Sequence, residues 1–153
     1  MTAPASLGAY SQRPTPPSVE TQTVAFVEFA RASRRGVVSK WLKWGGFNVY
    51  LRYSKDCPVA GEKRGEVLVI ASIESPVRFQ RRGWFWRYCQ LCLALVDGGL
   101  IIESVVNEEL ERAISERPDF VEIMPNTYFL QKLGPNFRPL LLLKAPSVTP
   151  PSI

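Results

Sequence analysis

The chain of 153 residues is 46% hydrophobic and 22% charged, an ordinary globular composition that predicts one domain of roughly 110–120 residues with loose ends. No apolar run approaches the roughly 20 residues that a membrane-spanning helix needs, and we expect no signal peptide because the first residues lack a basic and an apolar region. Three cysteines, an odd number, argue against a secreted disulfide scaffold and indicate synthesis in the reducing cytoplasm of a cell.

The net charge of +5 is unevenly placed along the chain. Residues 1–90 carry 14 Lys and Arg against 6 Asp and Glu, whereas residues 91–153 carry 5 against 8. The segment from Glu103 to Glu122 holds seven of the 14 acids, which indicates either a solvated helix face or an acidic patch that docks on a basic neighbour. A chain with a basic and an acidic half can bind an anionic partner or another copy of itself.

Both chain ends are rich in proline. We expect residues 1–20 and 145–153 to be extended arms around a single domain at 21–144, because proline fixes φ and lacks an N–H donor. Arms of this kind are common where they lie across neighbours in an assembly. The prolines in question are Pro4, Pro14, Pro16 and Pro17, and Pro146, Pro150 and Pro151.

The first half of the domain contains two uncertain segments and one clear strand. Alternation within Thr21–Ala30 favours a strand, with a helix start as the alternative. The basic segment that follows predicts a helix near Val37–Trp44, ending at the two glycines 45 and 46. Phe47–Tyr53 alternates apolar and polar residues and predicts a strand. Ser54–Gly65, which contains one proline and two glycines, predicts a hairpin loop.

The second half predicts strands and helices in alternation. Glu66–Ile73 is continuously apolar, as a central strand should be. Gly83–Val96 predicts a nearly buried helix, closed by Asp97 and two glycines. Leu100–Val106 predicts a second central strand. Asn107 is a good N-cap for the next helix, which carries Glu108 and Glu109 in its first turn and ends near Pro118.

The last predicted elements are short strands at Val121–Met124, Thr127–Lys132 and Pro139–Lys144. Together the elements predict a mixed, mostly antiparallel central sheet with flanking helices, of α/β or α+β type.

Cys89 and Cys92 form a C-x-x-C pattern that is typical of redox pairs and of half a zinc site. Only Cys57 remains as a third sulfur and the chain has no histidine, so the ligand set for a tetrahedral zinc site is incomplete. The pair also lies in the middle of a predicted helix, where nothing stabilises a thiolate. We therefore interpret both residues as buried structural thiols and expect no metal.

All four tryptophans lie in two segments, residues 40–44 and 82–87, that interleave aromatic and basic residues. This composition suits stacking on nucleic acid bases with contacts to phosphates, a membrane-surface segment, or a protein interface. The basic segments 31–44 and 78–87 would carry the nucleic acid contacts. The candidate interface residues are Trp41, Trp44, Trp84 and Trp86.

The turn Gln80-Arg81-Arg82-Gly83-Trp84-Phe85 resembles the Q/R-x-x-G-x-G/A turn of acetyltransferases of the GNAT (Gcn5-related N-acetyltransferase) superfamily. The predicted order from Phe47 on, a hairpin, then strand–helix–strand–helix, then a hairpin, also resembles that family over about two thirds of the chain. The resemblance implies that the pantetheine arm of acetyl-CoA would lie along Val67–Ser72. It also implies that backbone N–H groups of the turn, aided by Arg81 and Arg82, would bind the pyrophosphate.

The sequence departs from the family pattern where the chemistry would take place. Phe85 stands where the family has Gly or Ala, and Ile114 stands where it has a tyrosine that acts as general acid. With no histidine in the chain, the remaining candidates are Glu74 or Glu103 as base. Tyr88 or Tyr128 would then be the acid.

These departures predict a degenerate, GNAT-like protein without cofactor or catalysis that acts by binding. Small proteins with a GNAT-like pattern also occur inside the particles of short-tailed bacteriophages, so we expect a structural component of a virion or a similar assembly, oligomeric with other protein subunits. The alternatives are an acetyl-CoA-dependent N-acetyltransferase and a basic nucleic-acid-binding protein.

Overall fold

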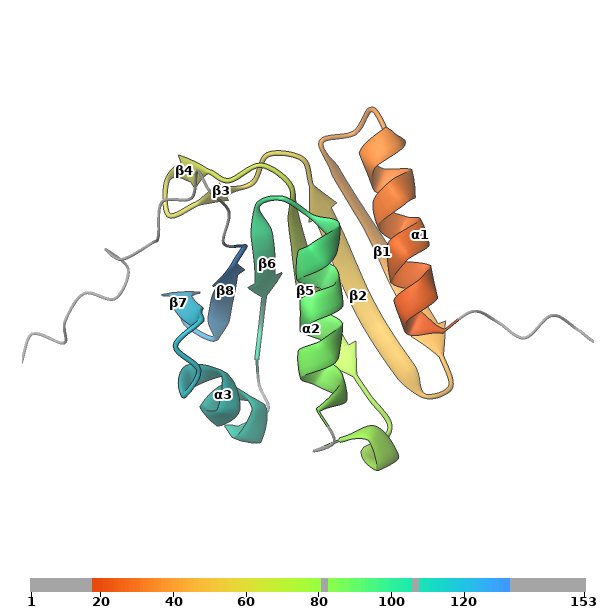
Figure 1. Cartoon of the computed structure of the whole chain (residues 1–153), viewed down its shortest axis with the longest axis vertical. Helices are drawn as coiled ribbons and strands as arrows, with labels where there is room; N and C mark the ends of the chain where they lie inside the picture. Colours follow the sequence, from red (N-terminus) through yellow and green to blue (C-terminus); the bar gives the residue numbers. More distant parts are fainter. Residues whose placement is uncertain (1–17, 81–82, 106–107, 133–153) are drawn as a thin grey trace, which may run out of the picture.

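The computed structural model describes residues 18–80, 83–105 and 108–132. In these residues the protein has an α+β fold, in which three helices and a small hairpin flank a six-stranded open sheet (Figure 1). The sheet is mixed but mostly antiparallel, with the order β1-β2-β5-β6-β8-β7. The helices are α1 (Val19–Ala32), α2 (Trp84–Leu95), α3 (Glu108–Ser115) and a single 3-10 turn, η1 (Val77–Phe79). The strands are β1 (Val37–Trp44), β2 (Phe47–Ser54), β3 (Pro58–Val59), β4 (Glu62–Lys63), β5 (Val67–Glu74), β6 (Gly99–Ile102), β7 (Phe120–Met124) and β8 (Thr127–Gln131).

The segment Thr21–Ala30, for which a strand was favoured, is part of helix α1. Ser18 caps this helix, since its Oγ accepts a hydrogen bond from the Thr21 N–H at 3.2 Å. Thr23, Val27 and Ala30 lie on one helical face with Val19 and Phe26 and are buried. The helical spacing of these positions therefore outweighs the alternation. The favoured strand was wrong, and the alternative, a helix, is confirmed.

The prediction of a helix over Val37–Trp44 was also wrong, because this segment is the edge strand β1. Gly45 and Gly46 do not end a helix. Both have positive φ, 52° and 89°, and form the two-residue turn of a β-hairpin, as such turns require. The turn sets the register of β1 with β2, with Trp44 opposite Phe47. The predicted strand at Phe47–Tyr53 is confirmed as β2.

The predicted central unit of strand, helix and strand is confirmed as β5, α2 and β6. Strands β5 and β6 are parallel, with Val67 to Ile70 opposite Gly99 to Ile102. Strand β6 ends at Ile102 and is shorter than expected. Helix α2 is less buried than expected: four residues face the core, whereas Arg87 and Gln90 are exposed.

The remaining elements agree with prediction within the described residues. Segment 54–65 contains the small hairpin β3–β4, and α3, β7 and β8 lie where helix and strands were expected. The expected N-cap Asn107, the expected strand Pro139–Lys144 and nearly all of both proline-rich arms lie outside the described residues.

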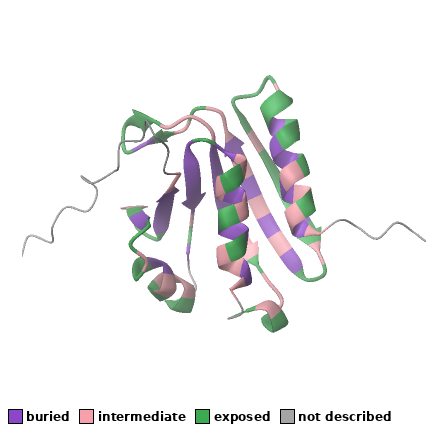
Figure 2. Ribbon diagram, in the orientation of Figure 1, coloured by how far each residue is buried: buried purple, intermediate pink, exposed green. Residues whose placement is uncertain are grey.

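The buried residues are concentrated in the central strands (Figure 2) and form two separate clusters. All three helices pack on one face, over a large cluster that includes Leu51, Ile70 and Leu100. The other face has a small cluster beneath the β3–β4 hairpin and is otherwise free of helices in the described residues. Val59, Val67, Val69, Ile101 and Phe129 form this smaller cluster. No helix in the described part of the chain is long and apolar enough to cross a membrane.

A polar network joins the C-terminal ends of α1 and α2 to the start of β5. The Arg31 guanidinium donates to both Glu66 carboxylate oxygens, at 2.7 and 3.0 Å, and to the Leu95 carbonyl at 2.6 Å. The hydroxyl of the fully buried Tyr53 also donates to the Glu66 carboxylate. The Glu66 N–H donates to the Asp97 carboxylate at 2.7 Å. This corner fixes the spacing of the helix layer over the sheet.

Candidate functional site

Strands β5 and β6 stop pairing before β5 ends. The paired register of the two strands reaches only Ile70 opposite Ile102, and the Glu103 N–H then donates to the Ile70 carbonyl at 3.0 Å. On its other side β5 has a bulge, because Tyr50 pairs with Ser72 while Leu51 pairs with Ile70. A bulge increases local twist and re-aims a strand, and the last residues of β5 therefore turn away from the line of β6.

The turn that resembles an anion-binding loop opens α2 at the same end of the sheet. Gly83 is the N-cap residue of α2 and has a φ of 77°. Because glycine has no side chain, the first backbone N–H groups of α2 receive no hydrogen bond acceptor from the N-cap side chain. The Gln80 side chain donates back to the Ser75 carbonyl at 3.1 Å. Arg81 and Arg82 lie outside the described residues. The turn therefore leads into the N-terminus of a helix, as expected. The expected contribution of the two arginines falls outside the described residues.

The two aromatic residues of this turn belong to the core and its margin. Trp84 is 7% exposed, stacks on Tyr88 with ring centroids 4.9 Å apart, and donates from its indole N–H to the Glu20 carboxylate at 2.6 Å. Phe85 is half-buried and meets the Trp86 ring edge-on at 5.2 Å. A bulky ring therefore occupies the position next to the helix N-terminus where the resemblance calls for a small residue.

The four candidate catalytic groups come from four different segments: the end of β5, the residue after β6, helix α2 and strand β8. Glu74 is exposed at the end of β5 and accepts a hydrogen bond from the Asn48 amide at 3.3 Å. Glu103 is held by the Arg52 guanidinium through two contacts of 2.9 and 3.3 Å. Tyr88 is 1% exposed and bonded to the Thr23 hydroxyl at 2.8 Å. Burial raises the pKa of Tyr88 far above its usual range, so its phenol is a poor proton donor.

Tyr128 lies apart from the turn, on β8. It is 3% exposed, and its pKa is raised by burial and by the nearby carboxylates of Glu122 and Glu111. A phenol in this setting is a weaker acid than a free one.

Of the four candidate interface tryptophans, Trp41 is the most exposed, at 51%. It stacks on Tyr50 of β2 with centroids 4.9 Å apart, on the sheet face that carries no described helix. Trp44 is half-buried against Phe47, and Trp86 is half-buried beneath the Arg117 guanidinium, 4.4 Å from its ring. Trp84 is in the core, as described above.

Cys89 and Cys92 are buried and free, which confirms their interpretation as buried thiols. Burial raises the pKa of both, that of Cys92 to about 12, so neither forms a thiolate at neutral pH. Cys57 is a third free thiol, away from the pair on the loop that leads into β3. Within the residues described, no cluster of acidic, Cys or His side chains is suited to hold a metal ion.

Strands β1 and β7 are the two edge strands of the sheet and lie on opposite sides of it (Figure 1), and the segments that contain them carry opposite charge. Residues 33–44, which lead into and form edge strand β1, carry four cations and no acid: Arg34, Arg35, Lys40 and Lys43, all exposed. Residues 108–124, which form α3 and edge strand β7, carry six acids against two arginines. We call residues 33–44 the basic edge and residues 108–124 the acidic edge.

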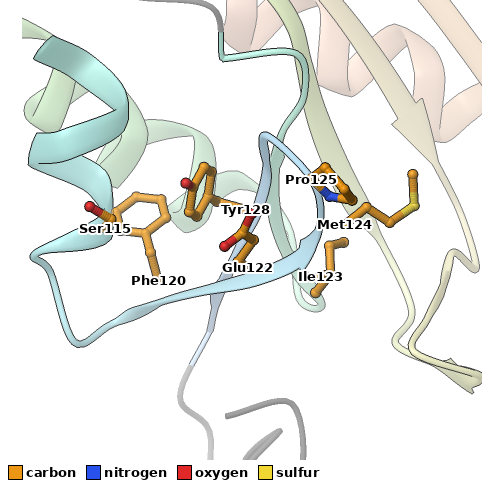
Figure 3. A pocket seen from close by; sticks show the side chains of 7 residues that line it. All are labelled: Ser115, Phe120, Glu122, Ile123, Met124, Pro125 and Tyr128. Atoms are coloured by element: carbon orange, nitrogen blue, oxygen red, sulfur yellow. The ribbon is translucent and has the colours of Figure 1, made fainter. Parts of the chain in front are cut away.

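A pocket of about 480 Å³ opens on the acidic edge, between the end of α3 and the β7–β8 hairpin (Figure 3). Sequence reasoning missed it, because its walls come from residues whose proximity depends on the pairing of β7 with β8. The strand alternation of Phe120 and Glu122 was the only signal that these side chains share a face. Its lining consists of Ser115, Phe120, Glu122, Ile123, Met124, Pro125 and Tyr128.

No family model, no curated protein and no solved structure matches this chain.

Proposed function

We propose that this protein is a non-catalytic binding protein and a subunit of a larger assembly, in which copies associate head to tail. The observation that carries the proposal is the separation of charge between the two edges of the sheet. The four cations of the basic edge lie at the β1 end of the strand order, and the acid-rich α3 and β7 lie at the other end. Complementary charged surfaces steer association and fix its register.

Both edges are suited to a contact between copies. In the described residues β1 and β7 each pair with only one strand, so each has an outer row of backbone N–H and C=O groups that can meet a neighbour. On β1 the Lys43 carbonyl of this row already accepts a hydrogen bond from the Gln22 side chain at 3.1 Å. Trp41 adds an exposed aromatic anchor beside the basic edge, the residue type that dominates binding energy at interfaces. Because the two edges differ, the contact would be head to tail and would generate a ring or a filament.

The state of the candidate catalytic groups supports a binding role. Glu103 is engaged by Arg52, Tyr88 is sealed in the core, and Phe85 stands beside the helix N-terminus. The strand order and the bulge in β5 favour a GNAT-like arrangement as the origin of the fold. The general pattern and length of the chain favour a bacteriophage particle as the kind of assembly.

A charge-swap experiment tests the head-to-tail contact. The variant Lys40→Glu/Lys43→Glu leaves the basic edge with two arginines against two acids, and the variant Glu108→Lys/Glu116→Lys leaves the acidic edge with four acids against four cations. In each variant one edge has lost its net charge and the attraction between unlike edges with it, so each variant alone should sediment as a smaller species than the parent chain. An equimolar mixture should associate again, because each variant supplies the edge that the other lacks. Sedimentation velocity at about 50 mM salt measures this, and at about 500 mM salt the association should weaken through screening.

Two results would overturn the proposal: a parent chain that stays monomeric at low salt, or a mixture that does not recover the association. Lys63→Glu, on the exposed β4 away from both edges, is the control and should associate like the parent. Circular dichroism of each variant separates loss of contact from loss of fold.

An acetyl-CoA-dependent N-acetyltransferase is the second candidate, favoured by the uncapped N-terminus of α2 beside the divergence of β5 from β6. Calorimetric titration with acetyl-CoA decides between the two. We expect no binding by the parent chain, since the Phe85 ring obstructs the phosphates, and a gain of binding in Phe85→Gly if the site is otherwise intact. Micromolar binding by the parent chain would favour the enzyme.

Nucleic acid binding, favoured by the exposed Trp41 beside Lys43, is the remaining alternative.

A further inference from the structure

The pocket on the acidic edge has the chemistry of a site for an organic cation. Among the described residues that line it, Glu122 is the one that is charged. Glu122 lies on β7 directly across from Tyr128 on β8, and the carboxylate of Glu111 on α3 is near enough to raise, with that of Glu122, the pKa of Tyr128. Two carboxylates thus border the same phenol, and none of the described residues that line the pocket is a cation. The local potential is negative, which disfavours anions.

The remainder of the lining is apolar or aromatic. Figure 3 shows the ring of Tyr128 between that of Phe120 and the side chains of the hairpin turn, with the Glu122 carboxylate beside it. Met124 is 62% exposed, although it is a large apolar side chain. A ligand that fits must combine a positive head for Glu122 with a stem that covers apolar surface.

A guanidinium group meets these requirements better than an ammonium group. It is planar, weakly hydrated and able to bind a carboxylate with two parallel hydrogen bonds while it stacks on an aromatic face. The protein already uses this mode close by, where the Arg117 guanidinium covers Trp86 at 4.4 Å and pairs with Asp119 at 3.1 Å. Arg117 does not line the pocket, so it leaves the pocket open to an outside arginine.

We propose that this pocket is an arginine socket, in which the Glu122 carboxylate binds the guanidinium of an arginine side chain. Its source rests on the proposed head-to-tail contact: Arg34 and Arg35 are exposed at the start of the basic edge, which the acidic edge of the next copy would meet. The chemistry of the pocket does not depend on that contact.

Titration of isotopically labelled, full-length protein with N-acetylargininamide, followed by amide resonances, tests the chemistry. We expect saturable shifts centred on residues 115–128. N-acetylcitrullinamide, the neutral isostere, should shift them at least about tenfold more weakly because it cannot form a charge-assisted pair. Glu122→Gln should weaken the binding of the arginine probe by about tenfold. Glu116→Gln removes an exposed acid of the same edge that does not line the pocket, and should change the affinity less than twofold.

Three results would each overturn the socket: equal affinity for the two probes, resonance shifts centred outside residues 115–128, or an affinity of Glu122→Gln for the arginine probe equal to that of the parent chain. Sedimentation of Arg34→Gln, Arg35→Gln and Glu122→Gln then identifies the source. Weaker self-association in Glu122→Gln and in one arginine variant supports the arginine of another copy. If the probe binds but the parent chain does not self-associate, the arginine socket stands and the head-to-tail proposal is rejected. If the parent chain self-associates but the probe does not bind, the head-to-tail proposal stands and the socket is rejected.

Discussion

Replacing Gly98 with alanine should destabilise the protein by about 3 kcal/mol or more, because the new methyl group would overlap with backbone on two sides. An added Cβ would lie 2.3 Å from the Arg64 carbonyl oxygen and 2.5 Å from that of Glu66. The backbone at Gly98 cannot move away without losing a hydrogen bond, since the Gly98 N–H donates to the Glu66 carbonyl at 2.7 Å. It also stands directly before β6, so any shift would disturb the central pair of strands. The midpoint of urea unfolding, followed by circular dichroism, measures the loss.

Gly36→Ala is the matched control for this experiment. The added Cβ at Gly36 has nothing within 4 Å and its φ is ordinary. Alanine should therefore be neutral there or should stabilise by about 0.5 kcal/mol, by restricting the unfolded chain. Similar midpoints for the two alanine variants would contradict the close approach of backbone at Gly98.

The elements that the sequence predicted correctly are those with a strong pattern of their own. Strand β2 alternates fully between buried and half-buried residues, and β5 begins with a continuous apolar run from Val67 to Ala71. Strand β1 has no such pattern, because it lies at an edge and only Leu42 is fully buried. With lysine and tryptophan exposed on it, its identity as a strand depends on pairing with β2, which a local pattern does not contain.

Helix α1 illustrates a second limit. Thr23 lies in the core, fully buried, because its hydroxyl bonds both the Val19 carbonyl at 2.7 Å and the Tyr88 hydroxyl at 2.8 Å. Tyr88 is 65 residues away in the sequence, so its hydrogen bond to Thr23 cannot be foreseen from the local pattern. In that pattern Thr23 counts as a polar residue, and the buried face of the helix is therefore not recognised.

The candidate site was predictable in composition but not in placement. The sequence identified the uneven charge and the turn at residues 80–85. It did not reveal that Trp84 would be a core residue, since burial of its ring depends on contact with Phe47 and Tyr88. Nor did it place the basic and acidic segments at opposite edges, because that requires the strand order.

Replacing Glu66 with alanine should cost about 2 kcal/mol, chiefly because it leaves the buried Tyr53 hydroxyl without its acceptor. The ion pair with Arg31 adds less, since the Arg31 side chain is 50% exposed and an exposed pair contributes little. Asp56→Ala is the control. Its partner Lys63 is 78% exposed, so the free energy of unfolding should change by less than about 0.5 kcal/mol.

The same network predicts how stability depends on pH. Hydrogen bonds from Arg31 lower the pKa of Glu66 in the folded protein below its usual 4.5. Below pH 4.5 the Glu66 carboxylate is therefore protonated more readily in the unfolded chain than in the folded protein. This contribution to stability is complete above pH 4.5 and is lost as the pH falls through the lower, folded pKa. Burial, aided by the bond to Glu66, raises the pKa of Tyr53 from 10.0 to about 12. The neutral phenol is thus favoured in the folded protein, and this contribution is present below pH 10 and lost between pH 10 and 12.

Unfolding free energies of the parent chain, Glu66→Gln and Tyr53→Phe across this pH range separate the two groups. The difference between the parent and Glu66→Gln should be largest near neutral pH and should narrow below pH 4.5, since only the parent gains a proton at this position on unfolding. The difference between the parent and Tyr53→Phe should narrow above pH 10, where the phenol of the unfolded parent ionises. Parallel curves at both extremes would mean that these side chains do not meet, and that another contact holds the end of α1 against the sheet.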